Sequence, residues 1–328
     1  MKDKIELFLV SGFLGSGKTT FIRKYAKYLE KKGERVCVIE NDHGSVNVDL
    51  MLLDDIRSKN IDVEMIACAC NTDKSSHLRR YRSKLITNAM LGYNRVIVEP
   101  SGIYDIDEFF DCLYEDPLDD WYEVGNAITI VDSTLEDNLS KESNYILASQ
   151  VSCAGTLLFS RVQELEGDKD KSIENVKSHI KRALKDIHCN KKIDNIIVTK
   201  PWDDLTDDDL EKIRNSGYER SSYVKESVIR NNEYKTFFYV DLNISKDELI
   251  NRINKIFADD SVGNVIRIKG FIPTENNKWI EVNATKKQLK VVESNVGQKI
   301  ILVIGEYMNM EHINEYFPEA VAIENKHK

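Results

Sequence analysis

The chain has 328 residues with 46 Lys+Arg against 55 Asp+Glu, which gives a formal net charge of −9. This length suggests two domains, and a hydrophobic fraction of 41% with 31% charged residues excludes a disordered chain. The acidic balance argues against a nucleic-acid partner, because phosphate backbones are bound by basic surfaces. No apolar run approaches the roughly 18 residues that cross a bilayer, so we expect a cytoplasmic protein without a membrane partner.

Short apolar runs alternate with amphipathic stretches along the first part of the chain. The runs are apolar on both faces, which is typical of buried parallel strands. Between them, residues such as Phe21, Tyr25 and Leu29 recur at helical spacing. This alternation predicts an α/β fold with a doubly wound sheet. We predict strands at Leu7–Val10, Val36–Ile39, Arg95–Val98, Ala127–Val131, Leu157–Phe159 and Asn195–Val198, and helices at Thr20–Lys31, Ser75–Met90, from Ile146 onward and at Ile173–Asp186.

A second pattern follows a polar stretch that runs from Thr206 to Asn232. The acidic run near its beginning is typical of a solvated helix start. We therefore expect a first α/β domain over residues 1–222 and a smaller C-terminal α+β domain over residues 234–328. The elements predicted in the second domain are strands Thr236–Leu242 and Val265–Phe271, helix Lys246–Phe257, and a strand pair that ends in Lys299–Ile304.

The segment Gly12-Phe13-Leu14-Gly15-Ser16-Gly17-Lys18-Thr19 fits the phosphate-loop pattern G-x-x-x-x-G-K-[ST] at every position. It follows a predicted strand directly and opens a predicted helix, so we expect the domain over residues 1–222 to be of the P-loop NTPase type. The glycines let backbone N–H groups point at the phosphates, and the helix adds the positive end of its dipole. We expect Lys18 to reach the β- and γ-phosphates and the Thr19 hydroxyl to bind magnesium. The other predicted nucleotide-binding residues of this segment are Gly12, Gly15, Ser16, Gly17 and Thr20.

Acidic residues follow two further predicted strands. One strand ends in Glu40-Asn41-Asp42-His43-Gly44, with Asp49 shortly after, and another ends in Glu99-Pro100-Ser101-Gly102. Ligands bind at the carboxyl ends of parallel strands, where carboxylates can hold magnesium or its waters. We expect Asp49 and Glu99 to contribute to the magnesium site and the Gly102 backbone N–H to approach the γ-phosphate. Asp42 or Asp49 is the expected sensor of the γ-phosphate.

These three segments, in this order, resemble the CobW-like GTPases of the CobW/HypB/UreG group of metallocentre-maturation proteins. The resemblance covers most of the chain. In the second half, Arg267-Ile268-Lys269-Gly270-Phe271 is similar to the R-x-K-G-[FL] strand of the family's C-terminal domain, and Trp279 stands where that domain has its usual Trp. The resemblance implies GTP hydrolysis coupled to delivery of a metal or metallocofactor to a client protein, with Lys18, Thr19 and Glu99 as the catalytic residues.

The family's metal motif, G-C-x-C-C, occurs here as Ala67-Cys68-Ala69-Cys70-Asn71. Thiolates are soft ligands that bind zinc or cobalt, and this chain keeps two of the three, Cys68 and Cys70. Together with Asp42 or His43 they can still form a tetrahedral site. The alternative is that this loop no longer binds a metal.

The family's guanine-recognition motif, N-K-x-D, becomes Ser160-Arg161-Val162-Gln163. Gln163 can accept one hydrogen bond from the base and Arg161 can stack on it, but the carboxylate that accepts both guanine N–H donors is missing. GTP and ATP therefore both remain candidate ligands. The segment Thr199-Lys200-Pro201-Trp202-Asp203 is interpreted as an ordinary strand-to-helix loop.

Two functions are consistent with these observations. The first is a magnesium-dependent nucleoside triphosphatase that delivers a metal to a client protein. The second is a nucleotide-binding switch or scaffold with little catalysis and no metal site, which docks to a metal- or corrinoid-dependent enzyme. The altered base motif and the missing third cysteine motivate the second.

Overall fold

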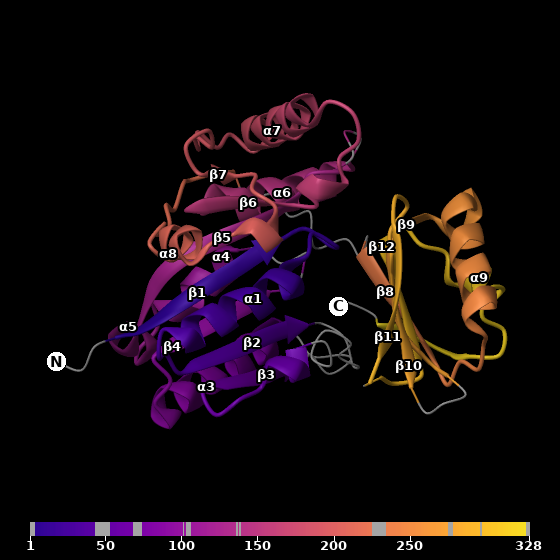
Figure 1. Cartoon of the computed structure of the whole chain (residues 1–328), viewed down its shortest axis with the longest axis horizontal. Helices are drawn as coiled ribbons and strands as arrows, with labels where there is room; N and C mark the ends of the chain where they lie inside the picture. Colours follow the sequence, from indigo (N-terminus) through magenta and orange to yellow (C-terminus); the bar gives the residue numbers. More distant parts are fainter. Residues whose placement is uncertain are drawn as a thin grey trace. The chain divides into compact units, whose positions relative to one another are not determined.

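The computed structural model describes residues 4–42, 53–67, 74–100, 102, 106–135, 137, 139–224, 234–274, 278–295 and 297–325. These residues form two compact units, one built on a largely parallel α/β sheet and the other on an antiparallel sheet (Figure 1). Each unit has its own hydrophobic core.

The first unit contains a seven-stranded sheet in the order β3-β2-β4-β1-β5-β6-β7. Its central strand β1 pairs in parallel with β4 on one side and β5 on the other. The predicted α/β fold with a doubly wound sheet is confirmed. The strands are β1 (Ile5–Gly12), β2 (Val36–Asp42), β3 (Ile61–Ala67), β4 (Arg95–Pro100), β5 (Tyr122–Asp132), β6 (Thr156–Ser160) and β7 (Ile197–Val198).

Helices cover both faces of this sheet. Successive side chains of a strand point to opposite faces, so Phe8 of β1 meets Tyr25 of the first helix at a ring-centroid distance of 5.7 Å. Its neighbours Leu7 and Leu9 belong to the core on the other face, together with Leu85. The helices are α1 (Lys18–Lys31), α3 (Lys74–Leu91), α4 (Asp107–Leu113), α5 (Leu118–Trp121), α6 (Lys141–Ser152), α7 (Lys169–Asp186) and α8 (Asp207–Arg214).

Strand β3 lies at one edge of the sheet and was not predicted. Its sequence alternates apolar and polar residues from Ile61 to Glu64. Ile61 and Val63 are buried, while Asp62 and Glu64 are partly exposed. This period-2 pattern is typical of a half-buried edge strand. Because its apolar residues alternate with polar ones, no continuous apolar run of the kind that marks a central strand occurs in β3.

The predicted solvated helix start is the beginning of α8. Thr206 caps this helix by accepting a hydrogen bond from the Asp209 backbone N–H, and the Asp209 carboxylate accepts one from the Thr206 backbone in return. This reciprocal capping box satisfies two N–H groups that have no partner within the helix. The acidic residues at its first turn also interact favourably with the helix dipole.

The second unit contains a six-stranded antiparallel sheet in the order β11-β10-β9-β12-β8-β13. Helix α9 (Lys246–Ala258) buries Leu249, Ile253 and Ile256 in a core that includes Phe237 and Val303 of the sheet. The predicted α+β class of this part is confirmed. Its strands are β8 (Tyr234–Val240), β9 (Asn264–Pro273), β10 (Trp279–Ala284), β11 (Leu289–Ser294), β12 (Ile300–Glu306) and β13 (Val321–Asn325), and the short helix α10 (Met310–Asn314) precedes β13.

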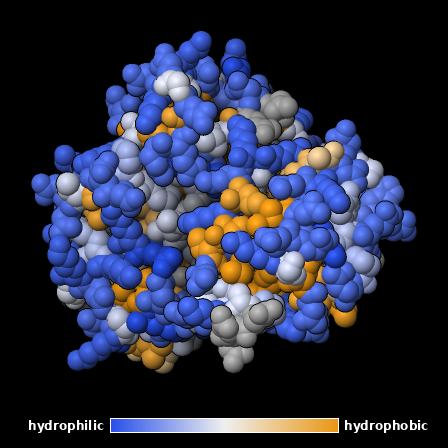
Figure 2. All heavy atoms as spheres, turned by 45° about the vertical axis from the view of Figure 1, so that its right-hand side comes forward, coloured by the Kyte–Doolittle hydropathy of each residue, from blue (hydrophilic) through white to orange (hydrophobic). Residues whose placement is uncertain are grey.

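Hydrophilic side chains dominate the face of the molecule drawn in Figure 2, and apolar side chains gather in a few patches. Large apolar side chains that are exposed in the second unit include Val292, Tyr307, Val321 and Ile323. In the described part of the chain, no helix combines the length and the apolar composition that a membrane span requires.

Candidate nucleotide-binding site

The phosphate loop joins the end of β1 to the start of α1. Gly15 and Gly17 have φ values of 77° and 99°, in the left-handed region that favours glycine. At Gly12, an added Cβ would lie 2.5 Å from the Ile130 carbonyl oxygen of neighbouring β5. The loop therefore requires glycines for two reasons, backbone conformation and close packing against the sheet.

Lys18 and Ser16 present buried polar groups to this loop. Lys18 is only 7% exposed, and its ammonium donates a hydrogen bond to the Gly12 carbonyl oxygen at 3.1 Å. The Ser16 hydroxyl is buried and has no hydrogen-bond partner among the described residues. Buried polar groups are normally hydrogen-bonded, so a hydroxyl of this kind beside a buried cation fits a site for an anionic ligand.

Two buried carboxylates lie at the strand ends next to the loop. The Thr19 hydroxyl donates a hydrogen bond to Glu99 Oε1 at 3.0 Å, and Glu99 is 5% exposed. Glu40 of β2 stands opposite Glu99 in the parallel β2–β4 register and is 3% exposed. Like charges on neighbouring strands are unfavourable unless a cation compensates them. The donor set of two carboxylates and a threonine hydroxyl fits a hard cation such as Mg²⁺. Glu40 is among the acidic strand-end residues that the sequence singles out, although no individual magnesium role was expected for it.

Gly102, at the end of the E-x-S-G segment, packs directly onto the phosphate loop. A Cβ added to it would lie 2.9 Å from the Leu14 backbone nitrogen and 2.8 Å from Leu14 Cδ2. The structure thus brings together the phosphate loop, Thr19, Glu99 and Gly102, as the sequence analysis expects. Their roles toward a nucleotide stay predictions.

Ser160, Arg161 and Gln163, the residues expected to contact the base, differ in exposure and in their contacts. Arg161 has a φ of 57°, and its guanidinium donates to Asp132 Oδ2 at 2.8 Å and to the Gly15 carbonyl oxygen at 3.2 Å. Ser160 is buried, whereas Gln163 is exposed. The Arg161 side chain therefore ties the end of β6 to the phosphate loop.

The loop after β7 contributes a contact that the sequence analysis missed. Trp202 leads into α8, as expected of a strand-to-helix loop, but its ring lies 3.1 Å from the position of a Cβ on Gly17. The indole N–H donates to the Phe159 carbonyl oxygen at 3.1 Å, and Lys24 donates to the Trp202 carbonyl oxygen. Trp202 thereby joins α1, β6 and the phosphate loop. No local sequence pattern indicates this contact, because it depends on β6 and β7 being neighbours in the sheet.

Several residues predicted to hold a metal lie outside the described residues. His43, Asp49, Cys68 and Cys70 are not described, and of Asp42 only the backbone, at the end of β2, is described. The expected magnesium role of Asp49 and the expected zinc or cobalt site therefore stay predictions.

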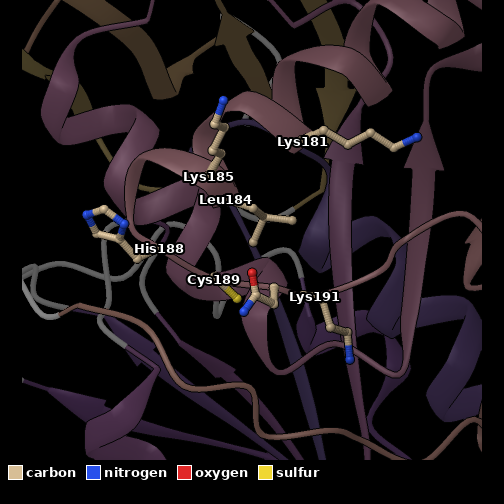
Figure 3. Close-up of a pocket in the computed structure, with 7 residues that line it drawn as sticks. Lys181, Leu184, Lys185, His188, Cys189 and Lys191 are labelled. Carbon is tan, nitrogen blue, oxygen red and sulfur yellow. The ribbon is translucent and has the colours of Figure 1, made fainter.

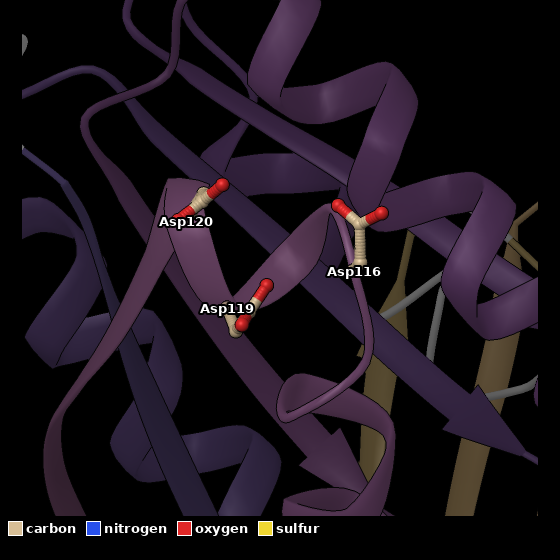
Figure 4. Close-up of side chains that lie close together, drawn as sticks. All are labelled: Asp116, Asp119 and Asp120. Carbon is tan, nitrogen blue, oxygen red and sulfur yellow. The ribbon is translucent and has the colours of Figure 1, made fainter.

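Two further groups of charged side chains lie in the first unit, one acidic and one rich in lysine. Asp116, Asp119 and Asp120 form an exposed acidic cluster just before β5 begins (Figure 4). The amino end of β5 is opposite to the end at which parallel β1 delivers the phosphate loop. The cluster is therefore separate from the predicted magnesium site.

The second feature is a cavity of about 420 Å³ beside the carboxyl end of α7 (Figure 3). Two of its lysines are already in ion pairs: Lys191 donates to Glu219 at 2.8 Å and Lys181 to Asp194 at 2.7 Å. The negative end of a helix dipole also disfavours an anion there. The cavity is lined by Lys181, Leu184, Lys185, His188, Cys189, Asn190 and Lys191.

Comparison with known proteins decides the family. A family model described as "CobW/HypB/UreG, nucleotide-binding domain" matches residues 6–188, more than half of the chain. The chain belongs to the CobW/HypB/UreG family. This confirms the resemblance on which the sequence analysis relied, and it places the phosphate loop, Glu99 and the end of β6 of this CobW-family chain within the matched region.

Among curated proteins, the CobW-family chain is 30% identical over 178 residues to "Zinc chaperone YjiA" of Escherichia coli, covering 53% of this chain and 54% of that protein. It is 26% identical over 315 residues to "Zinc-regulated GTPase metalloprotein activator 1" of Dictyostelium discoideum, covering 82% and 63%. The chain thus spans about half to two thirds of the length of these relatives. A solved structure, Zn(II)-bound YjiA GTPase from E. coli, aligns with 16% identity and a TM-score of 0.39 over 96% of this chain and 98% of that one.

Proposed function

We propose that this CobW-family protein binds and hydrolyses a nucleoside triphosphate with magnesium and couples hydrolysis to metal delivery to a client protein. The observation that carries the proposal is the buried Lys18 ammonium, held in a glycine-dependent loop beside the Thr19–Glu99 hydrogen bond. Phosphoryl transfer depends mainly on positioning and on charge stabilisation, and these groups supply both.

Each residue of the set has a separate task in this proposal. The Lys18 ammonium balances the negative charge that the β- and γ-phosphates carry. The hydroxyl of Thr19, the carboxylate of Glu99 to which it donates, and Glu40 opposite Glu99 provide oxygen ligands for magnesium or its waters. Magnesium, when bound, neutralises charge on the phosphate oxygens. The backbone N–H groups of the phosphate loop orient the triphosphate.

GTP is the proposed nucleotide because the Dictyostelium discoideum relative is named a GTPase. The residues after β6 give little support for a preference of guanine over adenine. Gln163 offers only a neutral acceptor where the family's N-K-x-D motif has a carboxylate. A guanine donor left without a partner costs about 1–3 kcal/mol. We therefore expect GTP and ATP to bind this chain with more similar affinities than an intact N-K-x-D motif would allow.

Zinc or cobalt is the proposed cargo, with Cys68, Cys70 and Asp42 as candidate ligands. The support comes from the soft-ligand chemistry of the thiolates and from the zinc in the names of the relatives. Calorimetric titration of zinc and cobalt tests it. The Cys68→Ser, Cys70→Ser double variant should lose the binding, and retention of binding would remove these thiols from the proposal.

The scaffold alternative has less support, because the set formed by Lys18, Thr19 and Glu99 is intact.

Steady-state hydrolysis of GTP and ATP with magnesium tests the catalytic proposal. Lys18→Ala should reduce turnover at least about 100-fold, whereas Lys27→Ala should not change it, since Lys27 is exposed on the same helix. Equal turnover by wild type and Lys18→Ala would refute the proposed mechanism.

A further inference from the structure

Gln150 is a completely buried polar residue of the first unit. It belongs to α6 and is followed by the equally buried Val151. Its side-chain N–H donates a hydrogen bond to the Gly102 carbonyl oxygen at 3.2 Å. Burying a primary amide is unfavourable unless its groups are hydrogen-bonded. The hydrogen bond to Gly102 therefore compensates part of the cost of burying Gln150.

The backbone of Gln150 is connected to the beginning of the phosphate loop. Thr129 Oγ1 of β5 donates to the Gln150 carbonyl oxygen at 2.9 Å, one of the last carbonyls of α6. The same hydroxyl lies 2.9 Å from the hydroxyl of Ser11, the residue that precedes Gly12. Ser11 and Thr129 are both completely buried. This polar network therefore joins α6 to both Gly12 and Gly102.

Gly102 is fixed from two sides. On one side it packs onto Leu14, so closely that a Cβ would meet the Leu14 backbone nitrogen at 2.9 Å. On the other side its carbonyl oxygen accepts the hydrogen bond from Gln150. Lys18, which is expected to reach the β- and γ-phosphates, contacts Gly12 in the same early part of the loop. Gly102 is thus held beside the part of the loop where the terminal phosphate is expected.

The Gln150 amide also has an unused acceptor. Its Oε1 is buried and has no hydrogen-bond partner among the described residues. A purely structural contact to one carbonyl oxygen leaves this second polar atom unsatisfied, which costs about as much as one hydrogen bond contributes. The Gln150 amide therefore donates to one carbonyl oxygen and keeps an acceptor that can take one further N–H group.

We propose that Gln150 is a positioning residue that holds Gly102 against Leu14 and thereby lets the site distinguish a triphosphate from a diphosphate. The inference depends on the proposed function, since it assumes that the loop binds nucleotide. It predicts that Gln150 affects the γ-phosphate selectively, because the contacts expected to hold the α- and β-phosphates do not include Gly102.

The test compares the affinities of a non-hydrolysable GTP analogue and of GDP for wild type, Gln150→Leu and Ser149→Ala. Ser149 is the matched control, because it is buried in the same helix and its hydroxyl bonds within the helix to Ile146. Gln150→Leu should weaken analogue binding at least about fivefold and leave GDP binding unchanged. Ser149→Ala should alter neither. An equal loss for both nucleotides, or no loss, would overturn the inference.

Gly102→Ala provides the second arm. Its added methyl group would displace Gly102 from Leu14, so Gln150→Leu should cause no further loss of selectivity in that background.

A spectroscopic measurement on the wild type decides if neither Gln150→Leu nor Gln150→Met folds. The side-chain amide resonance of Gln150 should differ between the GDP and analogue complexes, and identical resonances would refute the inference. Failure of the wild type to bind any nucleotide would instead refute the proposed function.

Discussion

The hydroxyl of Thr19 donates a hydrogen bond to Glu99 over 3.0 Å and so joins the start of α1 to the end of β4. The two residues are 80 positions apart, but β1 and β4 are parallel neighbours, so the loop that leaves β1 lies at the end of β4. Carboxylate and hydroxyl oxygens in this arrangement are suited to organise magnesium beside a phosphate loop.

Glu99→Gln is expected to reduce hydrolysis about 100-fold and to raise the magnesium concentration that gives half-maximal activity. The amide keeps an acceptor for the Thr19 hydroxyl but lacks the negative charge that favours the cation. Hydrolysis rates measured over a magnesium titration check this. Glu123→Gln is the control, since Glu123 is exposed near the amino end of β5. An unchanged magnesium dependence in Glu99→Gln would contradict the assignment.

Gly12→Ala and Gly33→Ala separate steric packing from backbone strain. Both glycines have positive φ, 151° and 84°, but nothing lies within 4 Å of a Cβ at Gly33. Gly33→Ala should lower the free energy of unfolding by about 1 kcal/mol, from conformational strain alone. Gly12→Ala should lower it by about 1–3 kcal/mol more, because its Cβ meets the Ile130 carbonyl oxygen. Urea denaturation measures both, and equal losses would show that the packing at Gly12 relaxes.

Trp202 should report nucleotide binding by its fluorescence. The chain has three Trp residues, and only Trp202 contacts the phosphate loop within the described first unit. The change in intrinsic fluorescence on adding GTP should therefore disappear in Trp202→Phe and persist in Trp121→Phe and Trp279→Phe. Trp202→Phe should also lower the free energy of unfolding by about 1 kcal/mol, since the hydrogen bond to Phe159 is lost. A fluorescence change that survives in Trp202→Phe would exclude this reporter role.

His179 should make the stability of the first unit depend on pH. Burial between α6 and α7 lowers the pKa of His179 below its usual 6.5, although Asp137 acts in the opposite direction. The neutral ring pairs with Asn144 at 2.7 Å. Since the unfolded state binds the proton more readily, the unfolding free energy should be constant above pH 6.5 and should fall as the pH drops from 6.5 toward the lowered pKa.

Thermal unfolding between pH 5 and 8 measures this effect. His179→Gln should flatten the pH dependence in the acidic range. The matched variant His312→Gln, which changes an exposed ring of the second unit, should keep it. If His179→Gln and the wild type lose stability in parallel on acidification, the buried ring is not the source.

Gln163→Asp should restore guanine selection. A carboxylate at this position can accept both N–H donors of guanine, whereas adenine offers no matching pair. The ratio of GTP to ATP affinity should rise about tenfold, as measured by calorimetry. Gln163→Asn, which has no charge, is the control and should leave the ratio unchanged. A ratio that does not respond to the carboxylate would place base recognition elsewhere in the chain.

Much of this chain was predictable from short-range patterns. The phosphate loop, the central strands and the amphipathic face of α1 are all encoded by residues that are close in sequence. Strand β3 was missed because its apolar residues alternate, and α10 and β13 were missed because their patterns are short. The register of Glu40 opposite Glu99 and the contacts of Gln150 and Trp202 with the candidate site join segments that are far apart in sequence, and no local pattern indicates these pairings.

The sequence by itself determined the family, the α/β class and the loop that is expected to hold phosphate, because backbone conformation and hydrophobic periodicity are encoded locally. Only the tertiary structure decided which polar groups meet: Thr19 with Glu99, Gln150 with Gly102, and Arg161 with Gly15. The physical reason is strand order. The parallel sheet places the ends of β1, β4 and β6 along one edge, and this order depends on the packing of the whole unit.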